Sequence, residues 1–389
     1  MRILHTADWH LGRLFYGTYL TEDQAFVLEQ QFLQILKDEK IDIIVNAGDV
    51  FDRSVPPAEA VELWDSIITK VALDFNIPMI AIGGNHDGME RLEVGSKLLE
   101  RSGLHIVTQV KNGLKPIAFS DKWGTIDFYP LPFSEPQGIC HELAKHIHDN
   151  TFSNTVTYHE AYQSWIDFAK HYGHSERSVA ISHVFVAGGT SSESERPLSV
   201  GGLDNVAPFA YRDFNYTALG HLHGPQRVGA DHIRYSGSLL KYSFDESSQQ
   251  KSFTVVDIDA KGHVDINYIP ILAKRDVKVI SGKFDELIAD IELQNSCRDD
   301  YLLIQLEDTI PIIDAMARLR QRYPYVMTLE LVGRMAQTVA TTNGVRNYKN
   351  LSEEALFNQF AEEAWKHPLS EKEREYMKSL WNRIIKEEM

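Results

Sequence analysis

The sequence predicts an α/β fold in which two sheets pack face to face between helices, a four-layer arrangement. Short apolar runs alternate with helical patterns in the first part of the chain, which is typical of βα units in a mixed or parallel sheet. Several runs end in a glycine turn, as in "IDIIVNAGDVF" and "IPMIAIGGNHD". After about residue 270 strand and helix patterns alternate again, which indicates a second, smaller α/β module.

The strands are predicted from short apolar runs bounded by glycine or polar residues. They fall at residues 2–8, 41–51, 77–87, 178–186, 216–223, 232–238, 252–259 and 263–271. An amphipathic helix is predicted at residues 22–40, where Phe26 and Leu33 belong to the apolar face. A second helix is predicted at residues 56–72, with Pro57 near its first turn.

The composition of the sequence disfavours several classes of protein. The 389 residues are enough for two or three domains, and 43% hydrophobic with 24% charged residues is ordinary for a globular protein. The net charge of −16 argues against coating nucleic acid by bulk electrostatics, but it leaves room for bound metal ions. Cys140 and Cys297 form no CxxC pattern, which favours a reducing, cytoplasmic setting. No stretch approaches the roughly 20 apolar residues that cross a bilayer, so a membrane protein is not expected.

Polar residues gather where the predicted strands end. They are Asp8, His10, Asp49, Asp52, Asn85, His86, Asp87, His183, His221 and His223. Each fragment alone has an ordinary structural explanation, such as a turn, a helix cap or a core histidine. In open α/β sheets, however, ligands bind at this edge, and five strand ends carrying such residues together favour a binding site.

The residue types indicate a metal site. Carboxylates, imidazoles and an amide oxygen without thiolates suit manganese, magnesium or iron, and zinc less obviously. His221 and His223 lie two positions apart, so on an extended strand both rings project from one face. One carboxylate can bridge two ions roughly 3.5–4 Å apart, a pair that activates water and polarises a phosphoryl oxygen. The predicted chemistry is hydrolysis of a phosphate ester.

Five blocks in this order resemble the calcineurin-like metallophosphoesterases: "DWH" at 8–10, "GDVFD" at 48–52, "GNHD" at 84–87, His183, and "GHLH" at 220–223. The stretches "HTADWHLG", "GDVFDRSVPP", "SERPLSVGGLD" and "RYSGSLLKYSFDE" look like the SbcD branch of bacterial nuclease subunits, over roughly the first 270 residues. The rest of the chain resembles that branch only in layout.

The resemblance implies roles for individual residues. One metal ion would be held by Asp8, His10, Asp49 and His223, and the second by Asp49, Asn85, His183 and His221. Asp49 would bridge two divalent ions, expected to be Mn²⁺ with Mg²⁺ or Fe²⁺ as alternatives. The remaining two residues would be catalytic: His86 would face the scissile phosphate, and Asp87 would orient His86.

Other polar residues keep two interpretations. Asp52 stands where archaeal and eukaryotic relatives often have histidine, and here an acid that supports its own loop is the favoured interpretation. Arg196 lies in a Gly- and Ser-rich loop that either turns between strands or holds DNA phosphates, and the resemblance favours a loop at the rim of the active site. His5 and His105 have no place in the motif and are interpreted as structural.

Three domains are expected: a phosphoesterase at 1–270, an α/β cap that grips DNA at 271–338, and a linker with C-terminal helices at 339–389. Basic residues of the cap either contact DNA or form a solvated face; they are Lys274, Arg275, Lys278, Arg318, Arg320 and Arg322. In the last segment Ser370 and Glu373 form a capping box before an apolar helical face. These helices either pack on their own chain or dock on a partner, which the resemblance implies is an SbcC-like coiled-coil ATPase.

The predicted function is a two-metal DNA nuclease that hydrolyses phosphodiesters at DNA ends and hairpins in repair, recombination and replication. A homodimer is expected. One alternative is another enzyme of the family that acts on a small molecule or a phosphoprotein. Protein phosphatases of this type, however, have GNHE and GDxxDRG where this chain has "GNHD" and "GDVFDRS". A non-catalytic DNA-end tether is the other alternative, and the complete set of ligands argues against it.

Overall fold

The computed structural model describes residues 1–146, 156–195, 205–310 and 312–332, together with Ser370, Lys372 and Tyr376. The chain divides into two compact units, one of Met1–Leu306 with Ile312–Glu330 and one of Glu307–Pro311 with Leu331–Met389. The helices and strands below belong to the first unit, apart from the last residue of the final strand. Arg196, the predicted linker and the pattern of the C-terminal helices lie outside the described residues.

The first sheet is built from the N-terminal βα units. Its strands lie in the order β14 (Val264–Pro270), β13 (Ser252–Ile258), β1 (Arg2–Thr6), β4 (Ile43–Asn46), β5 (Met79–Ile82) and β6 (Leu104–Val107). In this sheet β1, β4, β5 and β6 pair in parallel, whereas β13 and β14 are antiparallel additions at one edge. The chain leaves β1, β4 and β5 at the same edge of the sheet, because neighbouring parallel strands end on one side.

The second sheet has the order β11 (Gln226–Val228), β12 (Ala230–Tyr235), β10 (Tyr216–Gly220), β9 (Arg177–His183), β8 (Gly124–Leu131) and β7 (Ile117–Asp121). Its central strands β8, β9, β10 and β12 are parallel, and both edge strands are antiparallel. Residues 104–170, for which the sequence patterns gave no prediction, supply β6, β7 and β8 with the helices α6 (Pro136–Ala144) and α7 (Tyr158–Lys170).

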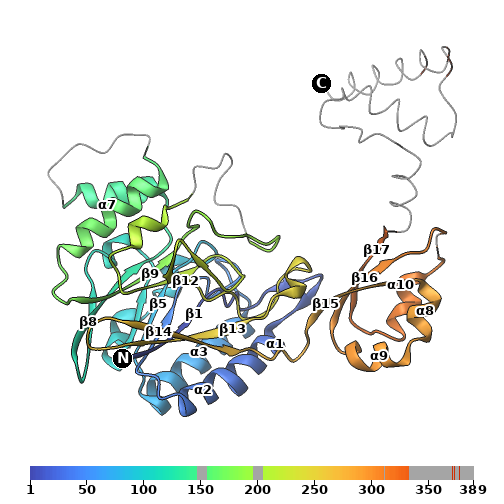
Figure 1. Ribbon diagram of the computed structural model, residues 1–389, viewed down its shortest axis with the longest axis horizontal. Coiled ribbons are helices and arrows are strands. Elements are labelled where there is room, and N and C mark those ends of the chain that lie inside the picture. The colour runs from blue at the N-terminus through green and yellow to red at the C-terminus, as the bar shows by residue number, and fades with distance from the viewer. Residues whose placement is uncertain are drawn as a thin grey trace. The chain divides into compact units, whose positions relative to one another are not determined.

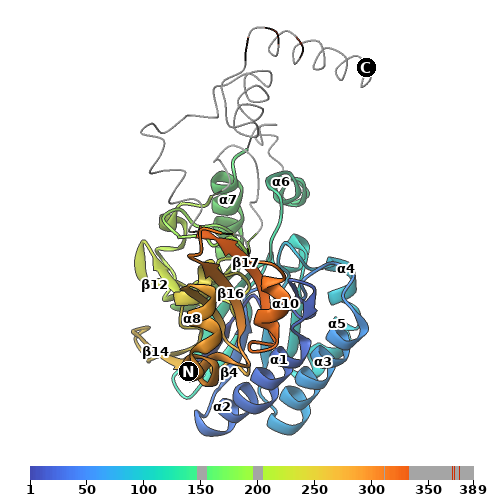
Figure 2. The ribbon, with the colours of Figure 1, turned by 90° about the vertical axis from the view of Figure 1, so that its right-hand side faces the viewer.

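Helices cover the outer face of each sheet. The first sheet is covered by α1 (Thr21–Phe26), η1 (Val27–Phe32), α2 (Leu33–Asp38), α3 (Ala58–Thr69) and η2 (Lys70–Phe75). Figure 1 shows α2 and α3 on one side of the sheets and α7 on the other, and Figure 2 shows α6 beside α7. The predicted helices at 22–40 and 56–72 are confirmed, with Pro57 as the cap residue before α3.

Apolar side chains fill the three spaces between the four layers. Between the two sheets, Ile3 and Val45 of the first pack with Ile126 and Val179 of the second. Trp64 of α3 and Phe32 belong to the core under the first sheet's helices, and α7 contributes Trp165 and Ile166 to the core on the second sheet. The predicted α/β sandwich of four layers is therefore confirmed.

A smaller three-stranded sheet follows, in the order β15 (Val277–Gly282), β16 (Tyr301–Leu306) and β17 (Val326–Leu331). It carries α8 (Phe284–Ala289), α9 (Ile291–Cys297) and α10 (Ala315–Arg320) on a core of its own that includes Phe284, Leu302 and Leu319. Within the described ranges, no helix has the length and apolar character needed to span a membrane.

The small module is tied to α1 through one buried carboxylate. Asp23 accepts two bonds of 3.0 Å from the guanidinium of Arg275 and a bond of 2.9 Å from the hydroxyl of Tyr301. Lys274 is ion-paired with Glu22, and Lys278 lies 2.6 Å from Asp300. Three of the six basic residues considered for DNA contact thus have acidic partners within the chain.

Candidate metal centre

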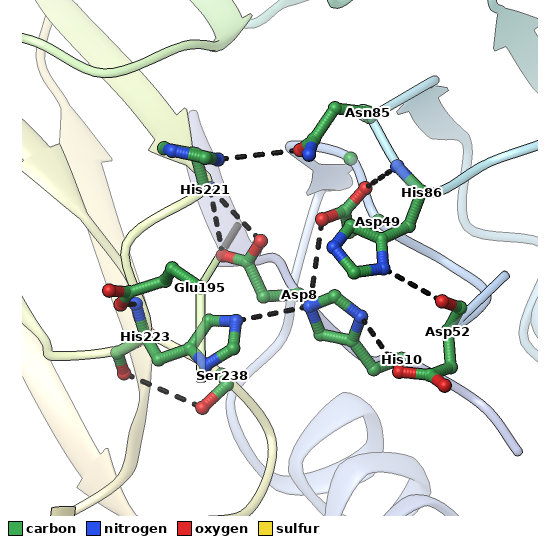
Figure 3. Close-up of polar contacts among 12 residues, drawn as sticks. Asp8, His10, Asp49, Asp52, Asn85, His86, Glu195, His221, His223 and Ser238 are labelled. Carbon is green, nitrogen blue, oxygen red and sulfur yellow. Dashed lines mark hydrogen bonds and ion pairs between the residues drawn. The ribbon is translucent and has the colours of Figure 1, made fainter. Parts of the chain in front are cut away.

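The site is assembled where β1, β4, β5, β9 and β10 end. Asp8 and His10 follow β1, Asp49 follows β4, Asn85 and His86 follow β5, His183 ends β9, and His221 and His223 follow β10. Backbone bonds join the first two loops, because Asp8 N–H donates to Gly48 O at 2.9 Å and His10 N–H donates to Asp49 O at 3.0 Å. The structure therefore brings all seven predicted ligands to one place, and Figure 3 labels all of them except His183.

Two motif glycines are needed for this close approach. A Cβ atom on Gly48 would lie 2.4 Å from Nδ1 of His183, and one on Gly84 would lie 2.1 Å from Oδ1 of Asp49. Such distances are far below van der Waals contact, so a side chain at either position would displace a proposed ligand. The glycines of "GDVFD" and "GNHD" thus let strand ends from both sheets converge.

Several residues of the site have an uncommon backbone conformation. Four of the predicted ligands have φ in the left-handed region, with values of 51°, 45°, 52° and 107° for Asp8, His10, Asp49 and His221. A non-glycine residue in such a region costs roughly 1–3 kcal/mol, and this strain persists only where the surroundings enforce it. Because these residues lie together at one edge, we infer that the fold tolerates backbone strain there in order to orient their side chains.

One half of the site consists of Asp8, His10 and His223. One possible ligand atom from each lies within 4.8 Å of the others, and all three residues are buried. The Nε2 atoms of His10 and His223 are 3.1 Å apart. Two nitrogen ligands about 2.1 Å from one ion at a right angle would be about 3 Å apart, so this spacing fits a shared ion.

The other half consists of Asn85, His183 and His221 around Asp49. Asn85 Oδ1 lies 2.9 Å from Nε2 of His183 and 3.3 Å from Nδ1 of His221, and His183 Nε2 lies 3.4 Å from Asp49 Oδ2. The other nitrogen of His183 donates to Ala47 O at 2.8 Å, which leaves Nε2 as the ligand atom. Figure 3 shows the carboxylates of Asp8 and Asp49 between the two halves.

Asp49 lies at the junction of the halves. Its Oδ2 is 3.5 Å from His10 Nε2 and 3.4 Å from His183 Nε2, and its Oδ1 accepts the backbone N–H of His86 at 2.8 Å. A carboxylate that faces imidazoles of both halves has the position that a bridging ligand requires.

Burial and mutual charge set the electrostatics. Burial raises the pKa of Asp8 well above its ordinary value, and burial lowers the pKa of His221 to about 3. Burial would also raise the pKa of Asp49, but His183 and His10 outweigh it and the pKa falls well below the ordinary range. Burial would lower the pKa of His183, but Asp49 and Asp8 raise it to about 9. Carboxylates and imidazoles this tightly packed away from water favour a bound cation.

His86 and Asp87 are each held by the loop that follows β4. The Nδ1 atom of His86 bonds to the backbone oxygen of Asp52 at 2.7 Å. The Asp87 carboxylate is instead occupied by the backbone N–H groups of Phe51 at 2.9 Å, Gly84 at 2.9 Å and Val50 at 3.2 Å. Asp87 braces the two loops that carry Asp49 and His86, because its buried oxygens satisfy backbone donors. Burial and the charge of Asp49 raise its pKa to about 7 despite these bonds.

Asp52 supports its loop, as the sequence suggested. Its Oδ1 forms an ion pair of 2.8 Å with Arg13 and lies 3.7 Å from Nδ1 of His10. That Nδ1 atom is buried and has no hydrogen-bond partner among the residues that the structure describes. His5, interpreted as structural, is buried and bonds Tyr216 and the carbonyl of Leu219.

Several polar residues around the site were missed by sequence reasoning. Gln24 of α1 donates to the carbonyls of Trp9 and His10 and accepts from Gly12 N–H, so it holds the loop after β1. Others surround His223: Ser194, Glu195, Glu246 and Lys251. The signal for three of these lay in the stretches "SERPLSVGGLD" and "RYSGSLLKYSFDE", which carry the resemblance to the SbcD branch but had no predicted role.

Comparison with known proteins places this site in a family. Residues 1–225 match the calcineurin-like phosphoesterase family, and residues 273–364 match a domain described as the type 5 capsule protein repressor C-terminal domain. The chain belongs to the calcineurin-like phosphoesterases, a family of metal-dependent enzymes.

The chain is also similar to curated relatives along most of its length. It is 36% identical over 334 residues to the SbcD subunit of nuclease SbcCD from Staphylococcus epidermidis, covering 85% of this chain and 86% of the relative. The same protein of Staphylococcus saprophyticus is 36% identical over 333 residues, covering 85% and 84%. A solved dimetal phosphatase from Danio rerio shows 14% identity and a TM-score of 0.39, covering 70% of this chain and 99% of that one.

Proposed function

We propose that this protein is a two-metal-dependent DNA nuclease, the nuclease subunit of an SbcC–SbcD-like complex that acts on DNA ends and hairpins. The observation that carries the proposal is the similarity to the SbcD subunits of nuclease SbcCD, which runs through the phosphoesterase segment and beyond it. The geometry of the strand ends supports it, because the seven residues expected as ligands lie together and all but the half-buried Asn85 are buried.

Two divalent ions, Mn²⁺ in our proposal, would be held by the residues already grouped into two halves. Asp8, His10 and His223 would hold one ion, Asn85, His183 and His221 the other, and Asp49 both. When bound, such ions activate water and polarise the phosphoryl group. The chain's own residues fix the ligand atoms; the Ala47 carbonyl, for example, holds the Nδ1 proton of His183.

His86 is the group we assign to the scissile phosphate. Its Nδ1 is held by Asp52 O, and its ring stacks edge to face on His10 with centroids 4.6 Å apart, so the imidazole is fixed beside the first half. Through Nε2 an imidazole in this position stabilises charge that develops on the phosphoryl oxygens or protonates the leaving oxygen. Asp87 contributes indirectly by holding the loop between β5 and His86.

The remaining segments complete the proposal. We assign residues 1–270 to the phosphoesterase, 271–338 to a cap that grips DNA, and 339–389 to a linker and helices that bind an SbcC-like coiled-coil ATPase. The separate family matches at 1–225 and 273–364 support a boundary between the first two segments. We place the protein in the cytoplasm with its DNA substrate.

We also propose a homodimer formed through an apolar groove. The groove, of about 790 Å³, lies between the α3–η2 segment and the segment of α4 (Met89–Leu92) and α5 (Ser96–Leu99). Leu73, Val94 and Leu98 on its walls are 71%, 75% and 72% exposed. Exposed apolar patches of this kind mark association sites, and a two-fold axis would let each copy's helices fill the other's groove.

Nuclease activity is tested by incubating the purified chain with end-labelled duplex and hairpin DNA and Mn²⁺. We expect cleavage of both, together with slow hydrolysis of bis-p-nitrophenyl phosphate. The Asp49→Ala variant, purified in parallel, controls for contaminating nucleases. Activity on p-nitrophenyl phosphate or a phosphopeptide without DNA cleavage would support the phosphatase alternative, and DNA binding without any hydrolysis would support the tether.

Dimerisation is tested by light scattering coupled to gel filtration. Leu98→Glu places a charge in the groove, so we expect the wild-type dimer to become a monomer. Leu272→Glu is the matched control, because Leu272 is 70% exposed outside the groove. A wild-type monomer, or a dimer that survives Leu98→Glu, would contradict the proposed interface.

A further inference from the structure

Two stretches outside the five metal-site blocks meet behind His223. Its backbone N–H donates to Oε1 of Glu195 at 2.6 Å, and its backbone oxygen accepts a bond of 2.7 Å from Nζ of Lys251. Its ring atom Nδ1 lies 2.5 Å from Oγ of Ser194. His223 is thus held at the N–H, the carbonyl and the side chain by residues from two distant segments.

The contacts continue from Ser194 into a buried ion pair. Ser194 Oγ donates to Oε1 of Glu246, which also accepts from Ser243 Oγ at 2.8 Å. The other carboxylate oxygen, Oε2, accepts from Nζ of Lys251 at 2.6 Å. Lys251 gives its remaining proton to Gln249 Oε1 at 2.7 Å, so its three donors are used by Glu246, Gln249 and the His223 carbonyl.

The number of available protons decides which atom donates and which accepts in each of these hydrogen bonds. A serine hydroxyl has one proton, and here that proton goes to the Glu246 carboxylate, which has none to give. Ser194 Oγ must then accept from His223, so Nδ1 carries the proton. The Nε2 atom, 3.1 Å from Nε2 of His10, keeps its lone pair toward the first half of the site.

The cost of this arrangement argues for a role beyond stability. Glu246 is fully buried and Lys251 is 4% exposed. Burying two charges costs several kcal/mol per ion, and their attraction roughly offsets this only in good geometry, so a buried pair adds little net stability over an apolar one. What the pair does supply is a fixed acceptor for Ser194 and a fixed donor to the His223 carbonyl.

We propose that Ser194, Glu246 and Lys251 form a positioning relay that fixes the tautomer and orientation of His223 for metal binding. The proposal rests on the proposed function in one respect, that His223 is a metal ligand. It gives a role to the stretches "SERPLSVGGLD" and "RYSGSLLKYSFDE". Two of its members, Glu246 and Lys251, lie in residues 226–272, between the segments matched by the two family descriptions.

The first test compares Ser194→Ala with the matched control Ser192→Ala. Ser192 lies in the same loop, and its hydroxyl bonds Glu195 at 3.0 Å, and more weakly Ser194 and Glu246 at 3.3 and 3.4 Å, rather than His223. Loss of a group that orients a histidine ligand typically weakens metal binding about 10–100-fold. Calorimetric titration with Mn²⁺ should therefore show one weakened ion and one unchanged ion in Ser194→Ala. Ser192→Ala should bind both as the wild type does, and Ser194→Thr, which keeps the hydroxyl, should restore most of the lost affinity.

The second test reads the tautomer directly. In metal-free protein with ¹⁵N-labelled histidine, the imidazole signals of His223, assigned by their loss in His223→Gln, should show the proton on Nδ1. In Ser194→Ala they should shift toward the Nε2–H form, a change that a purely structural role would not produce. Ser194→Ala with unchanged signals and two ions bound at wild-type affinity overturns the relay.

The ion pair is tested by a double-mutant cycle. Lys251→Met leaves a buried carboxylate unpaired and destabilises the protein, whereas Glu246→Gln with Lys251→Met keeps the site neutral and packed. We expect the double variant to fold and still bind one ion about 10-fold more weakly. If it binds both ions normally, the pair has no positioning role. The proposed function fails separately, if the wild type binds no Mn²⁺ or cleaves no DNA, and the tautomer measurement then still decides whether the relay exists.

Discussion

His183 and His223 stand in opposite halves of the site and are held in opposite ways. His183 donates from Nδ1 to the carbonyl of Ala47, a main-chain group at the end of β4, 2.8 Å away. His223 is held at Nδ1 by the Ser194 side chain, which depends in turn on Glu246. A main-chain carbonyl is present whatever side chain its residue carries, so this support depends only on the fold. Support by side chains depends on particular residues at each position.

The neighbours of the two histidines differ in another way, because His221 is held by another proposed ligand and the His10 loop by a residue outside the proposed ligands. His221 is fixed through its backbone N–H, which donates to both oxygens of Asp8 at 3.0 and 3.1 Å. His10 lies in a loop whose carbonyls are held by the Gln24 side chain at 2.8 and 3.0 Å. The half with His10 and His223 should therefore be the more sensitive to substitutions outside the ligands.

The largest effect is expected where the halves meet. Asp49→Ala removes the carboxylate that both ions would share, so neither should remain bound. Loss of one electrostatic group costs about 10²–10³ in kcat, and loss of the shared ligand should exceed this. Metal content after gel filtration and hydrolysis of bis-p-nitrophenyl phosphate measure it. His10→Ala should weaken mainly one ion, and an Asp49→Ala protein with two undisturbed ions would refute the bridge.

Next in size is a change that should leave both halves intact. His86→Ser removes the imidazole assigned to the scissile phosphate, so the rate should fall about 10²–10⁴-fold while both ions stay bound. Steady-state kinetics at saturating Mn²⁺ and calorimetry on the same samples measure the two quantities. His263→Ser, at an exposed histidine, is the control. Near-normal DNA hydrolysis by His86→Ser would leave His86 without a catalytic role.

A smaller effect is expected from Gln24→Ala, confined to the half with His10. The substitution leaves the buried Gly12 N–H without the Gln24 partner and removes one of two donors to each carbonyl, since Tyr242 still donates to Trp9 O and Arg13 N–H to His10 O. The free energy of unfolding should therefore fall by about 1–3 kcal/mol. Affinity for one ion should fall about 10-fold. Urea unfolding of the metal-free protein and Mn²⁺ titration test this. Gln34→Ala is the control, because the Gln34 side chain bonds Asp38 on the helix surface, and it should change neither the stability nor the Mn²⁺ affinity. Equal weakening of both ions by Gln24→Ala would contradict the difference between the two halves.

The smallest effect on the site is expected from a substitution of Asp121, at the strand ends that lie away from the site. Asp121 accepts bonds of 2.7 and 3.0 Å from Arg177 and lies 2.9 Å from the N-terminal ammonium. The bond from Arg177 is the main reason that its pKa lies well below the ordinary value, which burial opposes. Its contribution to stability is therefore complete above the unfolded pKa of about 3.9 and is lost as the pH falls toward the folded value.

Asp121→Asn should accordingly lower the free energy of unfolding at pH 7 by about 1–3 kcal/mol and leave metal binding unchanged. The difference from the wild type should shrink as unfolding is measured at pH 4, 3 and 2. Asp213→Asn, at an exposed ion pair, should show almost no difference at any pH. A difference as large at pH 2 as at pH 7, or a change in Mn²⁺ affinity, would contradict this division of roles between the two ends.

What the sequence could predict follows from how each feature is encoded. The four layers were predictable because β1, β4, β5, β9 and β10 are short apolar runs ending in polar residues, and parallel strands end at one edge. The convergence of the proposed ligands was predictable for the same reason, since Asp8 and Asp49 lie in the loops just after such runs and His183 ends one. Such features depend on local patterns that a single sequence displays.

Features that depend on contacts between distant residues were not predictable. Asp87 is next to His86 in sequence, yet its carboxylate turns to the backbone of Val50 and Phe51, about 36 positions away. Lys251 contacts the His223 carbonyl across 28 positions of sequence, and Glu246 lies beside the His223 ring from the same distant segment. Residues 104–170 gave no prediction, although α7 buries Tyr162 and Trp165 in the core over the second sheet.

The central claim is that one buried site holds two ions with Asp49 between them. Anomalous diffraction at the manganese edge, from crystals of the wild type soaked in Mn²⁺, tests it most directly. We predict two peaks about 3.5–4 Å apart, with the Asp49 carboxylate in contact with both. One peak should lie beside His10 and His223, and the other beside His183 and His221. A single peak, or two peaks of which Asp49 contacts only one, would contradict the account.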